Sequence, residues 1–215
     1  MKCVIFDLDG TLLYTLKDLQ ISTNFVLEKY GYKKRELNEI RKFVGNGIKK
    51  LIERASEEKD EKKLKILLDE FLIYYQKNSD KNTGAFEGIL EVLEKLKEKN
   101  IKIAVNTNKA DICAKKLCEK FFPNLIDLCV GETKNNPKKP NPAGVLEIIK
   151  KTSAREVIYI GDSLVDIQTA KNAQIPCISV LWGYCDKEFL LKENKNCANT
   201  AQELLDKIFQ EFKIM

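Results

Sequence analysis

The sequence contains no histidine in its 215 residues. Nucleophile systems built on Ser-His-Asp or Cys-His are therefore excluded, and so are zinc sites of the mixed Cys/His kind. Proton transfer in any active site must then be carried out by Asp, Glu, Lys, Tyr or Cys side chains. Carboxylates become the leading candidates for acid–base chemistry.

Paired cysteines and long apolar runs are also missing. The seven cysteines are an odd number without any Cys-x-x-Cys spacing, so neither a disulfide framework nor a four-cysteine metal site is favoured. No stretch approaches the 18 apolar residues of a membrane-spanning helix, and charged residues follow Met1 too closely for a signal peptide. These absences predict reduced thiols, no membrane partner and a cytoplasmic location.

The charged residues form no block of one sign, although the formal net charge is +5. The 37 basic and 32 acidic residues are interspersed along segments with helical periodicity, which is typical of solvated helix faces. The lysine pairs lack the interleaved aromatic residues of nucleic-acid-binding surfaces. We therefore expect no nucleic acid partner, and one domain with a small insert, as either a monomer or a homodimer.

Short apolar runs alternate with helical patterns along most of the chain. Strand character is found at residues 3–6, 101–105, 125–130, 157–160 and 177–181. Helical apolar stripes lie between them, at residues 89–96 and 145–149. This alternation predicts an α/β fold, a Rossmann-like, doubly wound parallel sheet with ligands at the carboxyl ends of its strands.

The segment after the first strand departs from the alternation. Residues 15–80 show helical patterns and no convincing strand, and the clearest apolar stripe runs from Leu64 to Tyr75. A polar linker at residues 78–84 follows it. We therefore predict a core of residues 1–14 and 81–215, and a helical insert of residues 15–80 placed to cover the active site as a lid.

Two carboxylates stand directly after the first apolar strand. Residues 7–12 read DLDGTL, so period-2 geometry aims Asp7 and Asp9 at the same side of the strand end, and Gly10 lets the backbone turn. An unpartnered buried carboxyl costs about 2 to 7 kcal/mol before charge is counted, so the pair indicates a cation or a reaction. Such pairs also occur in glycosyl transferases, in nucleases and by chance in loops.

Polar groups also follow the later strands. Thr107 and Asn108 come after the second strand, Lys139 after the third, and Asp162 and Asp166 after the fourth. Each has an ordinary alternative as a turn residue, a helix cap or an exposed lysine. Their occurrence after successive strands nevertheless matches what a phosphoryl-transfer site requires.

The charges of such a site must be balanced. A carboxylate nucleophile and a phosphate dianion repel one another unless positive charge intervenes. Asp7, Asp162 and Asp166 together could hold Mg²⁺, which prefers oxygen ligands, and Lys139 adds one further positive charge. Since the sum stays negative even with Lys139, we expect the Mg²⁺ cofactor to be indispensable.

The sequence resembles the haloacid dehalogenase superfamily of phosphohydrolases, and within it the phosphoglycolate phosphatase branch. Four motifs carry the resemblance in order along the whole chain: DLDGTL at residues 7–12, TNK at 107–109, KPNP at 139–142, and GDS at 161–163 with Asp166. The insert at residues 15–80 is similar to the family's helical cap, which lies between the first and second motifs. The resemblance implies a phosphatase acting on a small phosphorylated metabolite.

The resemblance also implies roles for individual residues. Asp7 would attack phosphorus to form an aspartyl-phosphate, and Asp9 would protonate the leaving alkoxide and then activate water. Mg²⁺ would be bound by Asp7, the backbone carbonyl of Asp9 and Asp162, while Asp166 would orient its water shell. The other assignments are Thr107 and Lys139 for holding the transferring phosphoryl group, and Asn108, Arg41, Gly45 and Gly47 for binding substrate.

One departure concerns substrate preference. Relatives continue the first motif with an Asp-Ser pair, whereas this chain has Tyr14-Thr15, a phenol in place of a carboxylate near the cap hinge. Arg41 could pair with a small carboxylate such as that of phosphoglycolate, or be a solvated helix residue. Phosphoglycolate is the expected substrate; the alternatives are pyrophosphate, a sugar or nucleotide phosphate, a phosphomutase reaction and a noncatalytic binding protein.

Overall fold

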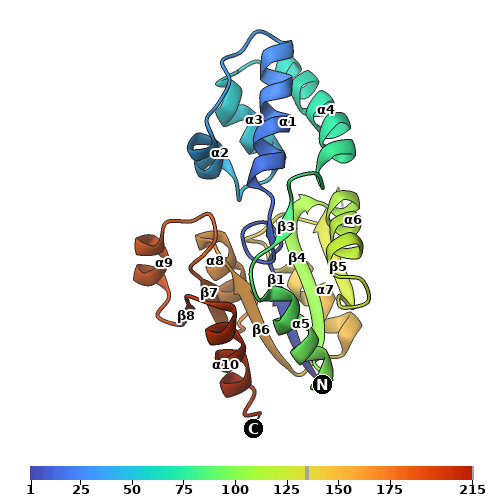
Figure 1. Ribbon diagram of the computed structural model, residues 1–215, viewed down its shortest axis with the longest axis vertical. Coiled ribbons are helices and arrows are strands. Elements are labelled where there is room, and N and C mark those ends of the chain that lie inside the picture. Colours follow the sequence, from blue (N-terminus) through green and yellow to red (C-terminus); the bar gives the residue numbers. More distant parts are fainter. Residues whose placement is uncertain (134–135, 215) are drawn as a thin grey trace.

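The computed structural model describes residues 1–133 and 136–214. Its centre is a six-stranded parallel sheet with the order β5-β4-β1-β6-β7-β8, which confirms the predicted fold class (Figure 1). The strands are β1 (Lys2–Phe6), β4 (Lys102–Ala110), β5 (Leu128–Glu132), β6 (Glu156–Gly161), β7 (Cys177–Val180) and β8 (Cys197–Ala198).

Alternation along the strands divides the core into two layers. Val4 and Phe6 of β1 face one apolar layer, whereas Cys3 and Ile5 face the other, because successive side chains point to opposite sides of a sheet. The first layer is covered by α5 (Ile89–Glu98), α6 (Asp111–Phe121) and α10 (Ala201–Glu211). The second is covered by α7 (Ala143–Thr152) and α8 (Leu164–Asn172), and α9 (Lys187–Glu193) packs beside α8.

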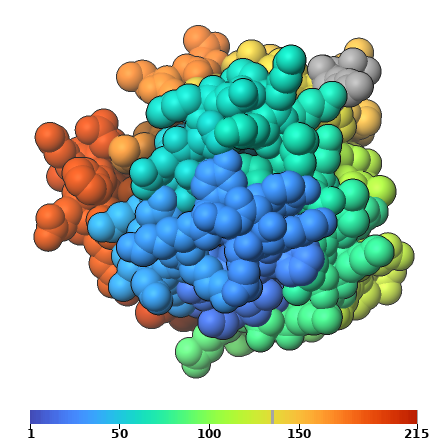
Figure 2. All heavy atoms as spheres, turned by 90° about the horizontal axis from the view of Figure 1, so that it is seen from above, coloured from blue at the N-terminus to red at the C-terminus, as the bar shows by residue number. Residues whose placement is uncertain are grey.

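Between β1 and the rest of the sheet, the chain forms a separate group of helices, which we call the α1–α4 unit. It consists of α1 (Leu16–Lys29), α2 (Leu37–Phe43), α3 (Ile48–Ser56) and α4 (Glu61–Asn78). Leu19, Val26, Leu64 and Phe71 are among the buried side chains that pack these helices together. The unit stands over one end of the sheet, and Figure 2 shows it covering the middle of the molecule from that side.

Two adjacent chain crossings join the α1–α4 unit to the sheet. The outgoing strand β2 (Leu13–Tyr14) pairs antiparallel with the returning strand β3 (Gly84–Ala85). The carboxylate of Asp18 accepts hydrogen bonds from the Asn82 backbone, the Asn82 side chain and the Thr83 hydroxyl, at 2.8 to 3.1 Å. The start of α1 is thereby fixed to the returning crossing.

Some strand boundaries differ from the sequence prediction. The second strand was expected at residues 101–105 but continues to Ala110, with a register shift between Asn106 and Ala110. The added part of β4 is polar, and the side chains of residues 106–109 are buried in the site described below. Sequence reasoning ended the strand where the apolar run ended. The strands β2, β3 and β8 were not predicted, since two residues are too few to show alternation.

No helix within residues 1–133 and 136–214 combines the length and the apolar composition that crossing a membrane requires.

Candidate active site

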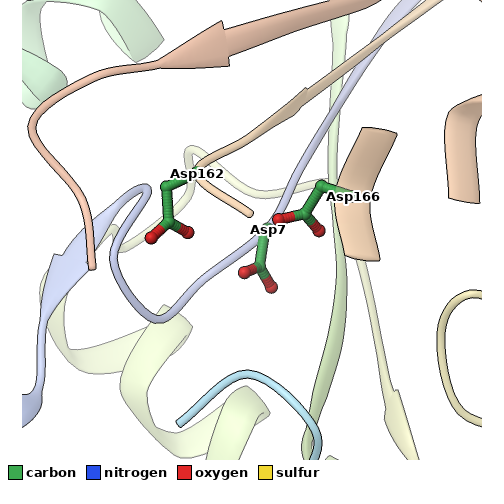
Figure 3. A group of neighbouring side chains, drawn as sticks. All are labelled: Asp7, Asp162 and Asp166. Carbon is green, nitrogen blue, oxygen red and sulfur yellow. The ribbon is translucent and has the colours of Figure 1, made fainter. Parts of the chain in front are cut away.

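Three carboxylates converge at the carboxyl end of the sheet. Asp7 follows β1, Asp162 follows β6, and Asp166 lies in the first turn of α8. One oxygen from each lies within 4.8 Å of the other two, and Figure 3 shows the three side chains gathered around a common space. The pairing of β1 with β6 in the sheet causes this, because it brings their carboxyl ends side by side.

The Asp162 carboxylate is held by the two segments that flank it. It accepts hydrogen bonds from the Thr11 hydroxyl at 3.1 Å and from the Tyr184 backbone N–H at 2.7 Å. A Cβ on Gly10 would lie 2.4 Å from Asp162 Oδ2, and one on Gly183 would lie 2.3 Å from it. Glycine at both positions therefore allows the backbone to approach the carboxylate closely.

Lys139 links two of the carboxylates. Its ammonium nitrogen lies 2.7 Å from Asp7 Oδ1 and 2.7 Å from Asp166 Oδ1. The Asn108 amide fixes the Lys139 backbone from both sides, accepting from its N–H at 2.8 Å and donating to its carbonyl at 3.2 Å. Asp166 also accepts from the backbone N–H and hydroxyl of Ser163, which caps α8. Hydrogen bonds from Asn108 and Ser163 thus hold Lys139 and Asp166 in position.

Burial and repulsion between carboxylates raise the pKa of Asp7 and of Asp162. Burial raises the pKa of Asp7 to about 7, although Lys139 opposes the shift. Burial, then repulsion from Asp166 and Asp7, holds the pKa of Asp162 well above its usual range. Burial lowers the pKa of Lys139, but the Asp166 and Asp7 carboxylates outweigh it and raise the pKa above the ordinary value. Lys139 therefore keeps its positive charge at neutral pH.

The donor set fits a hard divalent cation. Three buried carboxylates supply oxygen ligands, and Mg²⁺ prefers oxygen ligands while keeping some of its waters. Such an ion would favour the ionised form of Asp7 and Asp162, opposing the effect of burial. Sequence reasoning placed the backbone carbonyl of Asp9 at the metal. The side-chain carboxylate of Asp9 is not one of the three that converge.

Asp9 has partners of its own. Its Oδ1 accepts a hydrogen bond from the Thr15 hydroxyl at 2.6 Å, and the Lys109 ammonium lies 2.9 and 3.2 Å from its two oxygens. The Tyr184 hydroxyl in turn contacts Thr15, accepting from its backbone N–H at 2.6 Å. Sequence reasoning assigned no role to Lys109, although the TNK motif contains it, and none to Tyr184.

A cavity of about 370 Å³ opens between the sheet and the α1–α4 unit. Asp7, Asp9 and Asp162 line it from the sheet side, whereas Gly45 and Gly47 line it from the loop between α2 and α3. The Asn108 amide donates to the Gly45 carbonyl at 3.2 Å and so connects the two sides. Other sequence-predicted site residues in the lining are Thr107, Asn108, Lys139 and Arg41.

Arg41 lines this cavity but already has partners. Its Nε donates to the Tyr184 carbonyl at 2.8 Å, and its Nη2 pairs with the Asp186 carboxylate. These bonds use two of the five N–H donors of the guanidinium, so a substrate carboxylate would either bind the other donors or displace Asp186. Lys42 and Arg54, which sequence reasoning did not single out, also line the cavity. Their charge adds to that of Arg41 and makes the wall formed by the α1–α4 unit basic.

Comparison with known proteins gives a consistent result. The family described as haloacid dehalogenase-like hydrolase matches residues 4–180. A phosphoglycolate phosphatase of Colwellia psychrerythraea is 32% identical over 215 residues, which cover 95% of each chain. A protein of Caldanaerobacter subterraneus, provisionally named a pyrophosphatase, is 33% identical and covers 90% of this chain and 87% of its own.

A solved structure extends the likeness to three dimensions. A crystal structure from Lactobacillus delbrueckii subsp. bulgaricus, provisionally named a phosphoglycolate phosphatase, superimposes with a TM-score of 0.89. The two chains are 31% identical, and the match covers 96% of this chain and 98% of that one. Both the sheet and the α1–α4 unit are included in a match of this extent.

Proposed function

This chain belongs to the haloacid dehalogenase-like hydrolase family, and on that premise we propose that it is a Mg²⁺-dependent phosphatase of small phosphate monoesters. The observation that carries the proposal is the convergence of Asp7, Asp162 and Asp166 within 4.8 Å, with the Lys139 ammonium bound between two of them. This arrangement offers a nucleophile, a cation site and a fixed positive charge at one place.

In the proposed first step, a carboxylate oxygen of Asp7 attacks the phosphorus atom of the ester. The bond between phosphorus and the ester oxygen breaks, and Asp9 delivers a proton to the leaving alkoxide. Asp7 then carries the phosphoryl group as an aspartyl-phosphate. Lys139 is suited to bind the phosphoryl oxygens, because its ammonium already contacts Asp7.

The second step regenerates the carboxylate. Asp9, now ionised, takes a proton from a water molecule as the water oxygen attacks phosphorus. The bond between phosphorus and Asp7 breaks, and inorganic phosphate leaves. Asp9 is suited to both proton transfers because it lines the same cavity as Asp7, two residues away along the strand end.

Mg²⁺ would be held by Asp7, Asp162 and Asp166, and when bound it would supply positive charge against the phosphate dianion. Hydrogen bonds from neighbouring residues fix the orientation of two of these carboxylates. Thr11 and the Tyr184 backbone orient Asp162, and Ser163 orients Asp166. The site is therefore shaped before any ion arrives.

The proposal is tested by phosphate release from phosphoglycolate. The parent protein is expected to release phosphate with Mg²⁺ and to stop when the metal is chelated. Asp7→Asn should lower kcat by about 1,000-fold or more, because an amide is a poor nucleophile. Asp69→Asn, at an exposed carboxylate of α4, is the matched control and should keep full activity. An Asp7→Asn variant within tenfold of the parent would contradict the covalent route.

For the substrate, we propose phosphoglycolate itself. Support comes from the basic wall of the cavity, where Arg41, Lys42 and Arg54 are placed to attract a second anionic group. The cavity of about 370 Å³ suits a small molecule, and the α1–α4 unit, within residues 15–80, would act as the lid over it. Named phosphoglycolate phosphatases among the relatives point the same way.

Pyrophosphate is the second candidate, and a specific observation favours it. The relative from Caldanaerobacter subterraneus is as similar as the phosphoglycolate phosphatases are, and its name concerns pyrophosphate. The same basic residues would bind a second phosphoryl group as readily as a carboxylate. Comparing kcat/KM for phosphoglycolate and pyrophosphate decides between the two, and a value at least about tenfold higher for pyrophosphate would reassign the substrate.

A further inference from the structure

The ammonium group of Lys109 is buried beside the active site without contacting the three converging carboxylates. Its side chain is 1% exposed, and within the described residues its one ion-pair partner is Asp9. A buried ammonium is costly unless it is paired, so Lys109 and Asp9 hold each other in place. None of the roles proposed above uses this lysine.

The second partner of Lys109 comes from the α1–α4 unit. The ammonium donates to the Tyr75 hydroxyl at 2.6 Å, and the nitrogen lies 4.7 Å from the centre of the Tyr75 ring. Tyr75, on α4, is 1% exposed and stacks on Phe71 with 5.2 Å between ring centres. The position of its hydroxyl is therefore set by the packing of the unit.

These contacts decide where the Asp9 carboxylate points. Lys109 contacts both of its oxygens, and the Thr15 hydroxyl donates to one of them at 2.6 Å. Lys109 belongs to the end of β4, whereas Thr15 belongs to the outgoing crossing at the start of α1. The carboxylate is thus held between the sheet and the α1–α4 unit.

We propose that Lys109 is a positioning residue for Asp9, and that Tyr75 positions Lys109 in turn. Seating of the α1–α4 unit on the sheet then sets the orientation of the group that transfers the proton. The inference rests on the proposed function, in which Asp9 protonates the leaving alkoxide. It adds a physical link between closure over the cavity and the chemistry beneath it.

The test compares two esters that differ in their need for a proton donor. Phosphoglycolate releases a basic alkoxide, which needs protonation, whereas dinitrophenyl phosphate releases a stable phenolate, which does not. The measured quantity is kcat/KM, because it covers the steps up to departure of the alcohol and excludes the later hydrolysis. Lys109→Met should lower kcat/KM by about 100-fold for phosphoglycolate and by less than about fivefold for dinitrophenyl phosphate.

Tyr75→Phe guards against misfolding of the lysine variant. It removes one hydroxyl and keeps the stacked ring, so the variant should fold with the parent's melting temperature to within a few degrees. We expect kcat/KM to fall by about three- to tenfold for phosphoglycolate and to stay unchanged for dinitrophenyl phosphate. Tyr74→Phe is the matched control, since Tyr74 is the neighbour on α4 and stacks on Phe25, and it should leave both values unchanged.

A double-mutant cycle adds a readout that a structural role would not produce. In an Asp9→Asn background, Lys109→Met should cause no further loss with phosphoglycolate if the lysine acts through Asp9. Equal losses for the two esters in folded Lys109→Met and Tyr75→Phe variants, or full additivity in the cycle, would overturn the inference. A parent protein that cleaves neither ester would instead overturn the proposed function.

Discussion

At the scale of single residues, the position of the Asp162 carboxylate depends on the absence of side chains at Gly10 and Gly183. Gly10 has a positive φ of 89° and faces Asp162, and a Cβ there would lie 2.4 Å from the carboxylate oxygen. A Cβ on Gly183 would lie 2.2 Å from the Asp162 Cβ. Neither contact is tolerable, so a side chain at either position must displace the carboxylate.

Gly183→Ala is therefore expected to weaken Mg²⁺ binding rather than the fold. The Mg²⁺ concentration that gives half-maximal activity should rise by about tenfold or more, because one ligand is displaced from the other two. The quantity is obtained from a Mg²⁺ titration of phosphate release. Gly84→Ala, where a Cβ would meet nothing within 4 Å, is the control. An unchanged requirement in Gly183→Ala would separate Asp162 from the metal.

At the scale of elements, the joint between the α1–α4 unit and the sheet is a short two-stranded ribbon. The pairing of β2 with β3 is limited to Leu13 with Ala85 and Tyr14 with Gly84. So short a ribbon is weak by itself. Asp18 strengthens it, since its buried carboxylate accepts from donors of Asn82 and Thr83 on the returning chain.

Asp18→Asn should loosen this joint. The amide nitrogen of asparagine would face an N–H or O–H donor, and the loss of charge weakens the remaining bonds. We expect the free energy of unfolding to fall by about 1 to 3 kcal/mol, as measured by urea titration. Amide exchange at Asn82 and Thr83 should accelerate as well. The Asp69→Asn control should leave both unchanged, and equal stability of Asp18→Asn and Asp69→Asn would refute this role.

Glu58, in the connection between α3 and α4, makes one contribution to stability pH-dependent. The backbone N–H of Asp60, the Tyr32 hydroxyl and the backbone N–H of Lys59 donate to it and lower its pKa from 4.5 to about 2. Because the pKa is lower in the folded state, the carboxylate stabilises the fold above about pH 4.5, and this contribution is lost as the pH falls toward 2.

Glu58→Gln should consequently be less stable than the parent at pH 6, and the difference should shrink at pH 3.5. Urea titrations of both proteins at the two pH values measure it. Glu61→Gln, in the first turn of the same α4, serves as the control for removing a surface carboxylate. A difference between parent and Glu58→Gln that stays constant with pH would contradict the assignment.

At the scale of the whole molecule, the candidate site lies where the sheet and the α1–α4 unit meet. The unit has an apolar core of its own, which includes Leu19 and Phe71 and is joined by Cys113 from α6. The charged residues of the cavity come from both parts, with Asp7 and Lys139 on one side and Arg41 and Arg54 on the other. The cavity therefore brings charged side chains of both parts together.

Binding of Mg²⁺ should accordingly stabilise the whole protein. At a concentration 100-fold above its dissociation constant, the ion adds about 2.7 kcal/mol, which corresponds to a rise in Tm of about 5 to 10 °C. Thermal unfolding with Mg²⁺ and with a chelator measures the shift. Asp162→Asn should lose most of it, whereas Asp69→Asn should keep it. If the Tm of the parent protein is the same with Mg²⁺ and with a chelator, the result argues against a metal site.

The sequence by itself determined the parts of this protein that depend on local pattern. Apolar runs and helical stripes predicted the parallel sheet and the helical segment after β1, because buried strands and amphipathic helices have distinct periods. Polar residues after the strands predicted that Asp7, Lys139 and Asp162 lie close together, as they do in the structure, since the carboxyl ends of parallel strands meet at one edge. The order of residues along the chain was sufficient to predict these features.

Only the tertiary structure decided what depends on packing between distant segments. Tyr75 lies on an apolar stripe, so the sequence pattern predicts a core position for it. Its hydroxyl nevertheless accepts a hydrogen bond from Lys109, which belongs to the sheet. The close approach of Gly183 to Asp162 and the pairing of β2 with β3 leave no local pattern either. These contacts are set by how the α1–α4 unit rests on the sheet, because their partners lie far apart along the chain.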